Sequence, residues 1–170
     1  MTRWLVGVLL CSLALVGTAC GSGSGSRSDT GSKSDTAAAE RAAAKREAQA
    51  EYAKCQSQVG NLIKTESNLS SHLDVGLNYN EYTHSVGDVK AAYDSVPNDS
   101  LDIKCLPAGV AAENALNQYT KAATVWDSCF EDINCSNDSI DPTLQKRWAK
   151  ASTYIDRAKS AVDDIKNETA

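Results

Sequence analysis

The sequence has few aromatic residues and few basic ones. Aromatic side chains make up 6% of the 170 residues, with Phe130 as the single Phe, and alanine supplies much of the hydrophobic content. Alanine favours helices over strands, so the composition predicts closely packed helices and argues against a sheet sandwich. Lys and Arg number 17 against 22 Asp and Glu, and they form no basic patch. Because phosphate backbones require such a patch, we expect no nucleic acid partner.

The chain also lacks the short motifs that carry catalysis. It has no Gly-rich phosphate loop, no Gly-x-Ser-x-Gly elbow, no helical His-Glu-x-x-His and no Cys-x-x-Cys. We therefore expect no enzymatic activity, no catalytic residue and no cofactor.

Metal ligands are equally scarce. The only two histidines, His72 and His84, flank a turn near Asp74 and Glu81, and such a set could hold a transition metal. We prefer two solvated histidines, because they need not share a face. A second group of carboxylates lacks the ordered spacing of a calcium loop and is expected to form a solvated acidic end: Glu131, Asp132, Asp138 and Asp141.

The first 19 residues predict an export signal. A short charged start is followed by an apolar run from Trp4 to Val16 and by small residues before Cys20. The run is too short to cross about 30 Å of hydrocarbon, which needs roughly 20 helical residues. The segment resembles a bacterial lipoprotein signal peptide, in which small residues precede a lipid-bearing Cys, although Gly17 stands where that family usually has Leu. The resemblance implies lipid attachment at Cys20 and a membrane lipid as a partner.

The number of cysteines favours lipidation of Cys20 over ordinary secretory cleavage. Cys11 would leave with the signal, and a free Cys20 would give an odd total of five thiols in an oxidising compartment. Lipidation of Cys20 removes the odd one and leaves four.

Two linking segments follow Cys20. Residues 20–36 are Gly- and Ser-rich, with no residue able to build a core, and predict a flexible tether. Residues 37–51 are rich in Ala, Glu, Arg and Lys and predict a semi-rigid helical spacer. The alternative is that the alanine face of this spacer packs on a partner helix or on a second copy.

Residues 52–170 predict a domain of four helices. Apolar residues recur at three-four spacing in four segments, which extend from Tyr52 to Gly76, from an Asn78 cap to Pro97, from Pro107 to Ile133, and from an Asp141-Pro142 start to Ile165. Glu66 interrupts the first stripe. Because each stripe must be buried and turn residues separate the segments, we predict an all-α, antiparallel four-helix bundle with an N-terminal helical extension. A long extended coiled coil is the alternative.

Two disulfides are expected to staple this bundle. If the first two helices fold back about Gly76, Cys55 faces the region after Pro97, where Cys105 can reach it. Cys129 and Cys135 lie six residues apart across the next turn, so a local bond is feasible. We therefore predict pairs Cys55 with Cys105 and Cys129 with Cys135. A thiol or metal site is the alternative use, although the spacings fit no zinc pattern.

The run from Cys105-Leu106-Pro107 through Ala115-Leu116-Asn117-Gln118-Tyr119, Trp126-Asp127-Ser128-Cys129 and Leu144-Gln145-Lys146-Arg147-Trp148, behind a lipoprotein signal, resembles the small helical lipoproteins of actinobacteria. The resemblance implies the outer face of the cytoplasmic membrane and carries over no catalytic residue. The leading hypothesis is a tethered, non-enzymatic module that binds an envelope protein or component. A carrier or sensor of a small ligand or metal, and a phage-type exclusion or immunity lipoprotein, are the alternatives.

Overall fold

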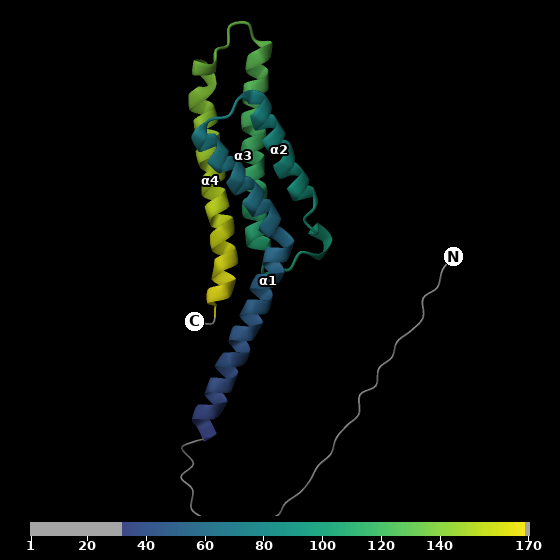
Figure 1. The fold of residues 1–170 in the computed structure, drawn as a ribbon, viewed down its shortest axis with the longest axis vertical. Helices are drawn as coiled ribbons and strands as arrows, with labels where there is room; N and C mark the ends of the chain where they lie inside the picture. Colours follow the sequence, from purple (N-terminus) through teal and green to yellow (C-terminus); the bar gives the residue numbers. More distant parts are fainter. Residues whose placement is uncertain (1–31, 169–170) are drawn as a thin grey trace, which may run out of the picture.

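The structure is a computed structural model that describes residues 32–168, with side chains from Thr36 onward. In these residues the chain forms four helices that alternate in direction: α1 (Ser32–Val75), α2 (Tyr79–Asp94), α3 (Leu106–Glu131) and α4 (Asn137–Asn167) (Figure 1). A short 3-10 turn, η1 (Asn98–Ser100), precedes α3. The predicted all-α antiparallel four-helix bundle is confirmed. The predicted signal peptide, Cys20 and most of the predicted tether lie outside the described residues.

Helix α1 is much longer than the others and is continuous through the predicted spacer. Its 44 residues extend well past the end of α4, so its first turns project from the bundle (Figure 1). Residues 36–43 are exposed, whereas Ala48 is 4% exposed and Cys55 is fully buried. No helix within residues 32–168 has both the length and the apolar character needed to cross a bilayer.

Local sequence signals set most helix ends. Gly76, with φ of 105°, follows α1 in the left-handed conformation that glycine adopts without strain. Asn78 caps α2 by accepting a hydrogen bond from the Glu81 backbone, and the Glu81 carboxylate accepts one from the Asn78 backbone, which is the predicted capping box. Pro107 lies in the first turn of α3, as predicted.

The predicted start of the fourth helix is wrong. Asp141 and Pro142 are not a cap and first turn, because α4 begins at Asn137 after the cap residue Ser136, and Pro142 lies inside the helix. Ser139 holds this earlier start: its hydroxyl donates to the Ser136 carbonyl at 2.6 Å. Pro142 is tolerated because it removes only one backbone bond near the helix start, to the carbonyl of the exposed Asp138.

The third helix is also shorter than its predicted stripe. Helix α3 ends at Glu131, so Ile133 lies in the following turn and is 98% exposed instead of buried. Phe130, predicted beside the stripe, is 65% exposed.

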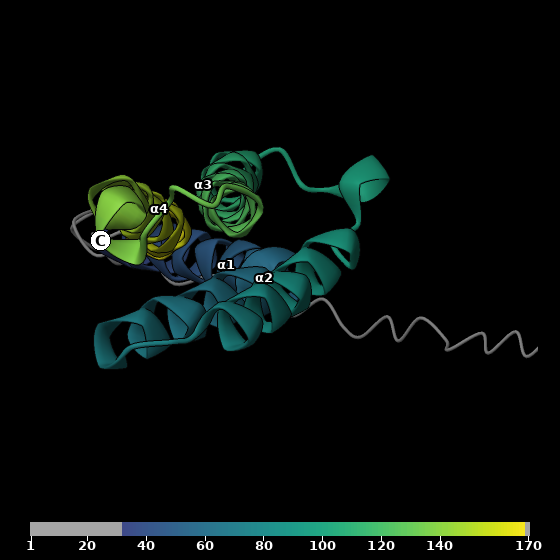
Figure 2. The ribbon, with the colours of Figure 1, turned by 90° about the horizontal axis from the view of Figure 1, so that it is seen from above.

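The core lies between two layers, α1 with α2 and α3 with α4 (Figure 2). The predicted four-three repeat of α4 is the clearest stripe, with all but Trp148 of its seven positions buried. Helix α3 contributes mostly alanines, which let the neighbouring helices approach closely. Only one acidic or basic side chain, Glu66, is fully buried among the described residues.

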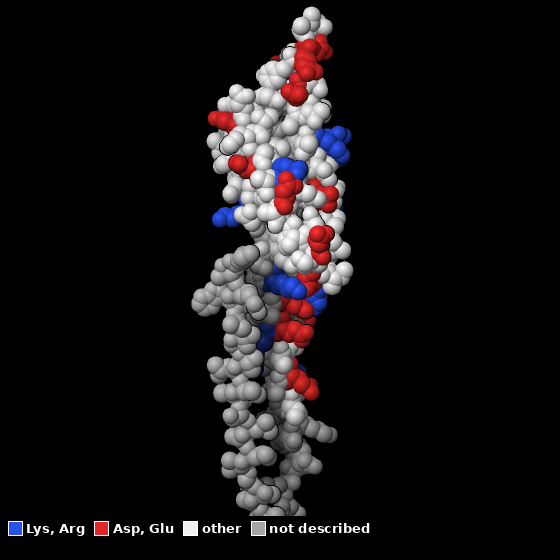
Figure 3. All heavy atoms as spheres, turned by 90° about the vertical axis from the view of Figure 1, so that its right-hand side faces the viewer, with Lys and Arg blue, Asp and Glu red and all other residues white. Residues whose placement is uncertain are grey.

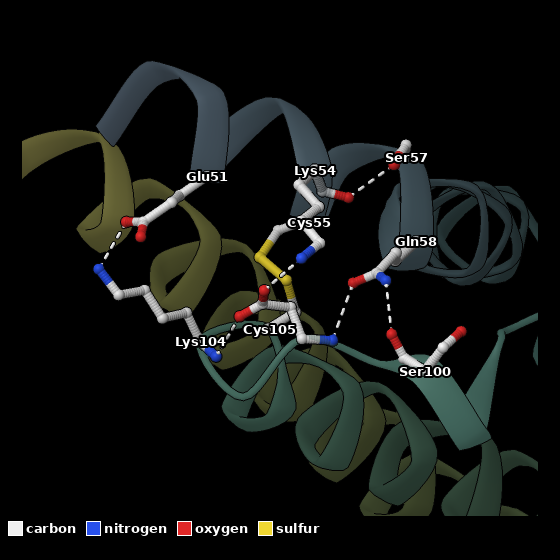
Figure 4. Close-up of polar contacts among 9 residues, drawn as sticks. Glu51, Lys54, Cys55, Ser57, Gln58, Ser100, Lys104 and Cys105 are labelled. Carbon is white, nitrogen blue, oxygen red and sulfur yellow. Dashed lines mark hydrogen bonds and ion pairs between the residues drawn. A yellow bond between two sulfur atoms is a disulfide. The ribbon is translucent and has the colours of Figure 1, made fainter. Parts of the chain in front are cut away.

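Both predicted disulfides are present, and the first anchors the connection between α2 and α3. Cys55 and Cys105 are fully buried, with Cα atoms 5.2 Å apart, and close a separation of 50 residues. Polar contacts surround the bond: Lys54 pairs with Asp102 at 2.6 Å, and Lys104 pairs with Glu51 (Figure 4). Cys129 and Cys135 clamp the turn between α3 and α4.

Candidate binding surface

Aromatic rings gather at the end of the bundle where the α1–α2 and α3–α4 turns lie. Tyr79, at the start of α2, contacts two rings of α3 edge-on: Phe130 at 4.8 Å and Trp126 at 5.8 Å between ring centroids. Trp126 continues the cluster to Trp148 of α4 at 6.1 Å. Edge-to-face contacts of this kind stabilise a fixed arrangement by about 0.5–1.5 kcal/mol each. The rings therefore form a continuous aromatic cluster on three helices.

Two adjoining hollows open beside these rings. One, of about 300 Å³, has Trp126, Trp148 and Leu144 on its walls and Asp138 and Asp141 at α4. The other is more open and is lined by Tyr79 and Phe130, and the two share Leu77, Trp126 and Asn137. We call this region the apical surface and define it by the following residues: Leu77, Tyr79, Trp126, Phe130, Asn137, Asp138, Asp141 and Trp148.

Several apolar side chains at this end are exposed to water. Phe130 is 65% exposed, Ile133 98% and Val75 89%. Single exposed apolar residues are common, but three at one end, beside an aromatic cluster, are typical of an interaction site. The Cys129–Cys135 bond closes the loop that carries Ile133, so the exposed Ile133 lies on a turn that is restrained by a disulfide.

Charge is segregated toward the same end. The two stretches that form it, residues 65–89 and 122–145, contain nine Asp and Glu but no Lys or Arg. The remaining residues contain thirteen Asp and Glu against seventeen Lys and Arg, and are net positive. On the face drawn in Figure 3, red carboxylates gather near the top, and the first blue side chains appear lower. The apical end is therefore acidic.

The carboxylates of the apical surface, and Asp127 beside it, have few internal partners. Asp141 accepts a weak hydrogen bond from Gln145 at 3.3 Å, and Asp127 accepts one from the Tyr79 hydroxyl at 2.8 Å. That bond to a carboxylate raises the pKa of Tyr79. None of Asp127, Asp138 and Asp141 forms an ion pair within residues 36–168. Their charge is available to a partner.

A second polar feature lies in the core below the rings. Glu66 of α1 is fully buried, and neither carboxyl oxygen makes a hydrogen bond of normal geometry with another described residue. Burial raises its pKa to about 9, and the nearby Leu116 backbone opposes this only in part. The Tyr119 hydroxyl and the Trp148 indole nitrogen are also buried without a hydrogen bond of normal geometry. At neutral pH the Glu66 carboxyl is therefore protonated and uncharged.

The two histidines weighed as alternative metal ligands lie on the surface of the bundle. His84 is exposed on α2, 3.9 Å from Asp88, and His72 is exposed near the end of α1. Within the part of the chain that the structure describes, no three His, Cys, Asp or Glu side chains form a cluster suited to a metal ion. Glu131, Asp132, Asp138 and Asp141 are all exposed, as expected for a solvated acidic end.

One further hollow, of about 390 Å³, lies between α1 and α4. Its lining includes the exposed side chains Lys64, Lys159 and Asp163, which mix both signs of charge. No residue of its lining has a buried polar group without a hydrogen-bond partner. It therefore provides fewer polar groups for binding a ligand than the apical surface does.

Comparison with protein-family models, with curated proteins and with solved structures gives no match for this chain. The function must therefore be argued from the residues of the chain itself.

Part of the apical surface was missed in the sequence. Trp126 and Trp148 were predicted as core residues of apolar stripes and the acidic group as a solvated end, not as parts of a binding surface. Leu77 and Tyr79 were not singled out, because they lie at a helix start outside the apolar stripe. The absence of Lys and Arg from residues 65–89 and 122–145 is visible in the sequence and could have indicated an acidic surface.

Proposed function

We propose that the chain is an exported lipoprotein, attached to the membrane through Cys20, that acts as a non-enzymatic binding module for a protein of the cell envelope. The observation that supports this proposal is the exposed apolar and aromatic group at the apical end, with Phe130 at 65% and Ile133 at 98% exposure. Water-exposed apolar surface of this kind is stabilised when a partner covers it.

The geometry of the chain suits such a role. The apical end and the start of α1 lie at opposite ends of the molecule (Figure 1). A 44-residue helix is roughly 65 Å long at 1.5 Å per residue. If Cys20 is held in the bilayer, this length would place the apical surface far from the headgroups.

The anchor is tested by phase partitioning in a bacterial host that processes lipoproteins. The wild-type chain is expected in the detergent phase, because an acyl chain is strongly apolar. The Cys20→Ser chain is expected in the aqueous phase. Equal partitioning of both would contradict the anchor.

The binding role is tested separately by photo-crosslinking in living cells. A photoreactive residue in place of Phe130 should give a discrete adduct with an envelope protein. The matched control is the same residue in place of Thr153, which is exposed on α4 away from the apical surface and should give none. Identical adducts at both positions, or none at either, would contradict a specific apical interface.

A further inference from the structure

We propose that the apical surface binds a basic, amphipathic segment of its partner, with a Lys or Arg side chain placed against Trp126 and apolar residues covering Phe130. This inference rests on the proposed binding role and specifies the chemistry of the partner.

The charge distribution is the first argument. The apical end is built from two stretches that carry eight exposed carboxylates, besides the buried and uncharged Glu66, and no Lys or Arg, although the whole chain has a net charge of only -5. Asp127, Asp138 and Asp141 have no ion-pair partner among the described residues. A field of one sign over a hollow attracts a ligand of the opposite sign and speeds its association. The complementary partner is therefore cationic.

The hollow itself is suited to a long basic side chain. Its volume is about 300 Å³, and the indoles of Trp126 and Trp148 form part of its wall, while Asp138 and Asp141 supply carboxylates. Indole faces attract ammonium and guanidinium groups, and their apolar surface packs against the methylene stem. A Lys or Arg can thus contact both the ring and a carboxylate.

The exposed apolar residues require a second property of the partner. Phe130 and Ile133 are too exposed to be covered by a single basic side chain. The Cys129–Cys135 bond already restrains this turn, so less conformational entropy is lost when a partner covers it. A segment that combines basic and apolar residues matches both parts of the surface.

A lipid bilayer does not satisfy these conditions. Bacterial membranes rich in anionic lipid would repel the carboxylates of the apical end, although the exposed Phe130 and Ile133 could otherwise insert. A basic protein segment is favoured by both the charge and the apolar surface.

The test uses the purified full-length chain and labelled synthetic peptides, followed by fluorescence anisotropy. A peptide of alternating Lys and Leu should bind at least about tenfold more tightly than one of alternating Glu and Leu, and its affinity should fall as salt rises. A Lys and Ser peptide should bind more weakly, because it cannot cover Phe130.

The matched variants remove the same charge from two ends of α4. The double variant D138N/D141N should weaken binding of the Lys and Leu peptide by about tenfold, as expected for lost charge contacts. The control D163N/D164N, near the other end of the helix, should leave the affinity unchanged. Equal weakening by both would overturn the proposal, since it would show attraction by net charge alone.

Two other results would overturn it. One is equal binding of the Glu and Leu peptide. The other is binding of the chain to anionic phosphatidylglycerol vesicles through the apical end, seen as loss of vesicle binding on replacing Phe130. An adduct from position 130 without peptide binding would keep the binding role and reject only this partner chemistry.

Discussion

Glu66 and Tyr119 lie close together in the core between α1 and α3, and neither side chain has exposed surface. The Glu66 carboxyl helps to raise the pKa of the Tyr119 phenol, after burial itself, and both groups lack a hydrogen bond of normal geometry. Beside them, the Tyr82 hydroxyl donates to the Tyr119 backbone carbonyl at 2.9 Å. The centre of the bundle is thus polar but uncharged, and its stability depends on the Glu66 proton.

Stability should decrease as pH rises above about 4.5. The pKa of Glu66 is raised from 4.5 to about 9, so between these values the folded state keeps a proton that the unfolded chain releases. Below pH 4.5 Glu66 is protonated in both the folded and the unfolded chain and costs no stability by ionisation. Above pH 4.5 the free energy of unfolding falls by about 1.4 kcal/mol per pH unit, and this decrease ends at about pH 9, where folded Glu66 also ionises. Urea unfolding at a series of pH values, with disulfides intact, measures this slope.

The variant Glu66→Gln should remove this slope and stabilise the protein at pH 7 by about 3 kcal/mol, because no ionisation is then suppressed on folding. Glu47→Gln, on the exposed part of α1, is the matched control and should keep the wild-type slope. Parallel pH profiles for the wild type and Glu66→Gln would show that Glu66 is not the group responsible.

The two disulfides should differ in their contribution to stability. Cys55–Cys105 closes a separation of 50 residues and Cys129–Cys135 one of six. Loop entropy predicts losses of about 4 kcal/mol for Cys55→Ala with Cys105→Ala, and about 2 kcal/mol for Cys129→Ala with Cys135→Ala. Urea unfolding of the two double variants measures the difference, and a larger loss at the local bond would refute this ranking.

The sequence predicted the helices and both disulfides because these depend on local pattern and chain reach. The stripe of α4 from Leu144 to Ile165 is periodic enough to set its buried face. The start of α4 was predicted wrongly because Asp141 followed by Pro142 is a favourable cap and first-turn pair, whereas the helix is capped five residues earlier, at Ser136.

The buried carboxyl and the apical surface were harder to predict. Glu66 appeared as an interruption in an apolar stripe, and periodicity alone does not tell whether such a residue turns outward or stays inside. The apical surface joins the start of α2 to the end of α3, which are far apart in the sequence and meet only when both helix hairpins close. The charge of this surface can be predicted from the sequence, but the contacts between its aromatic rings cannot.

Gln58 should anchor the connection between α2 and α3 to α1. Its side-chain carbonyl accepts from the Asp102 backbone at 3.1 Å, and its amide donates to the Ser100 carbonyl at 3.0 Å (Figure 4). Gln58→Ala should cost about 1–3 kcal/mol, because two hydrogen bonds are lost together. It should also speed hydrogen exchange at the Asp102 amide. Gln56→Ala, which removes only a contact with the Tyr52 hydroxyl, is the control and should change neither quantity appreciably.

Loss of the Cys129–Cys135 bond should weaken binding at the apical surface while leaving the helical core folded. The bond holds the turn that carries Ile133 and follows Phe130, and neither of its cysteines belongs to the buried core. The double variant Cys129→Ala with Cys135→Ala should therefore keep helical circular dichroism near the wild-type value. It should bind the Lys and Leu peptide about three- to tenfold more weakly, since the turn must now be ordered on binding. Unchanged affinity in a folded variant would show that the turn is not part of the interface, because ordering it would then cost nothing.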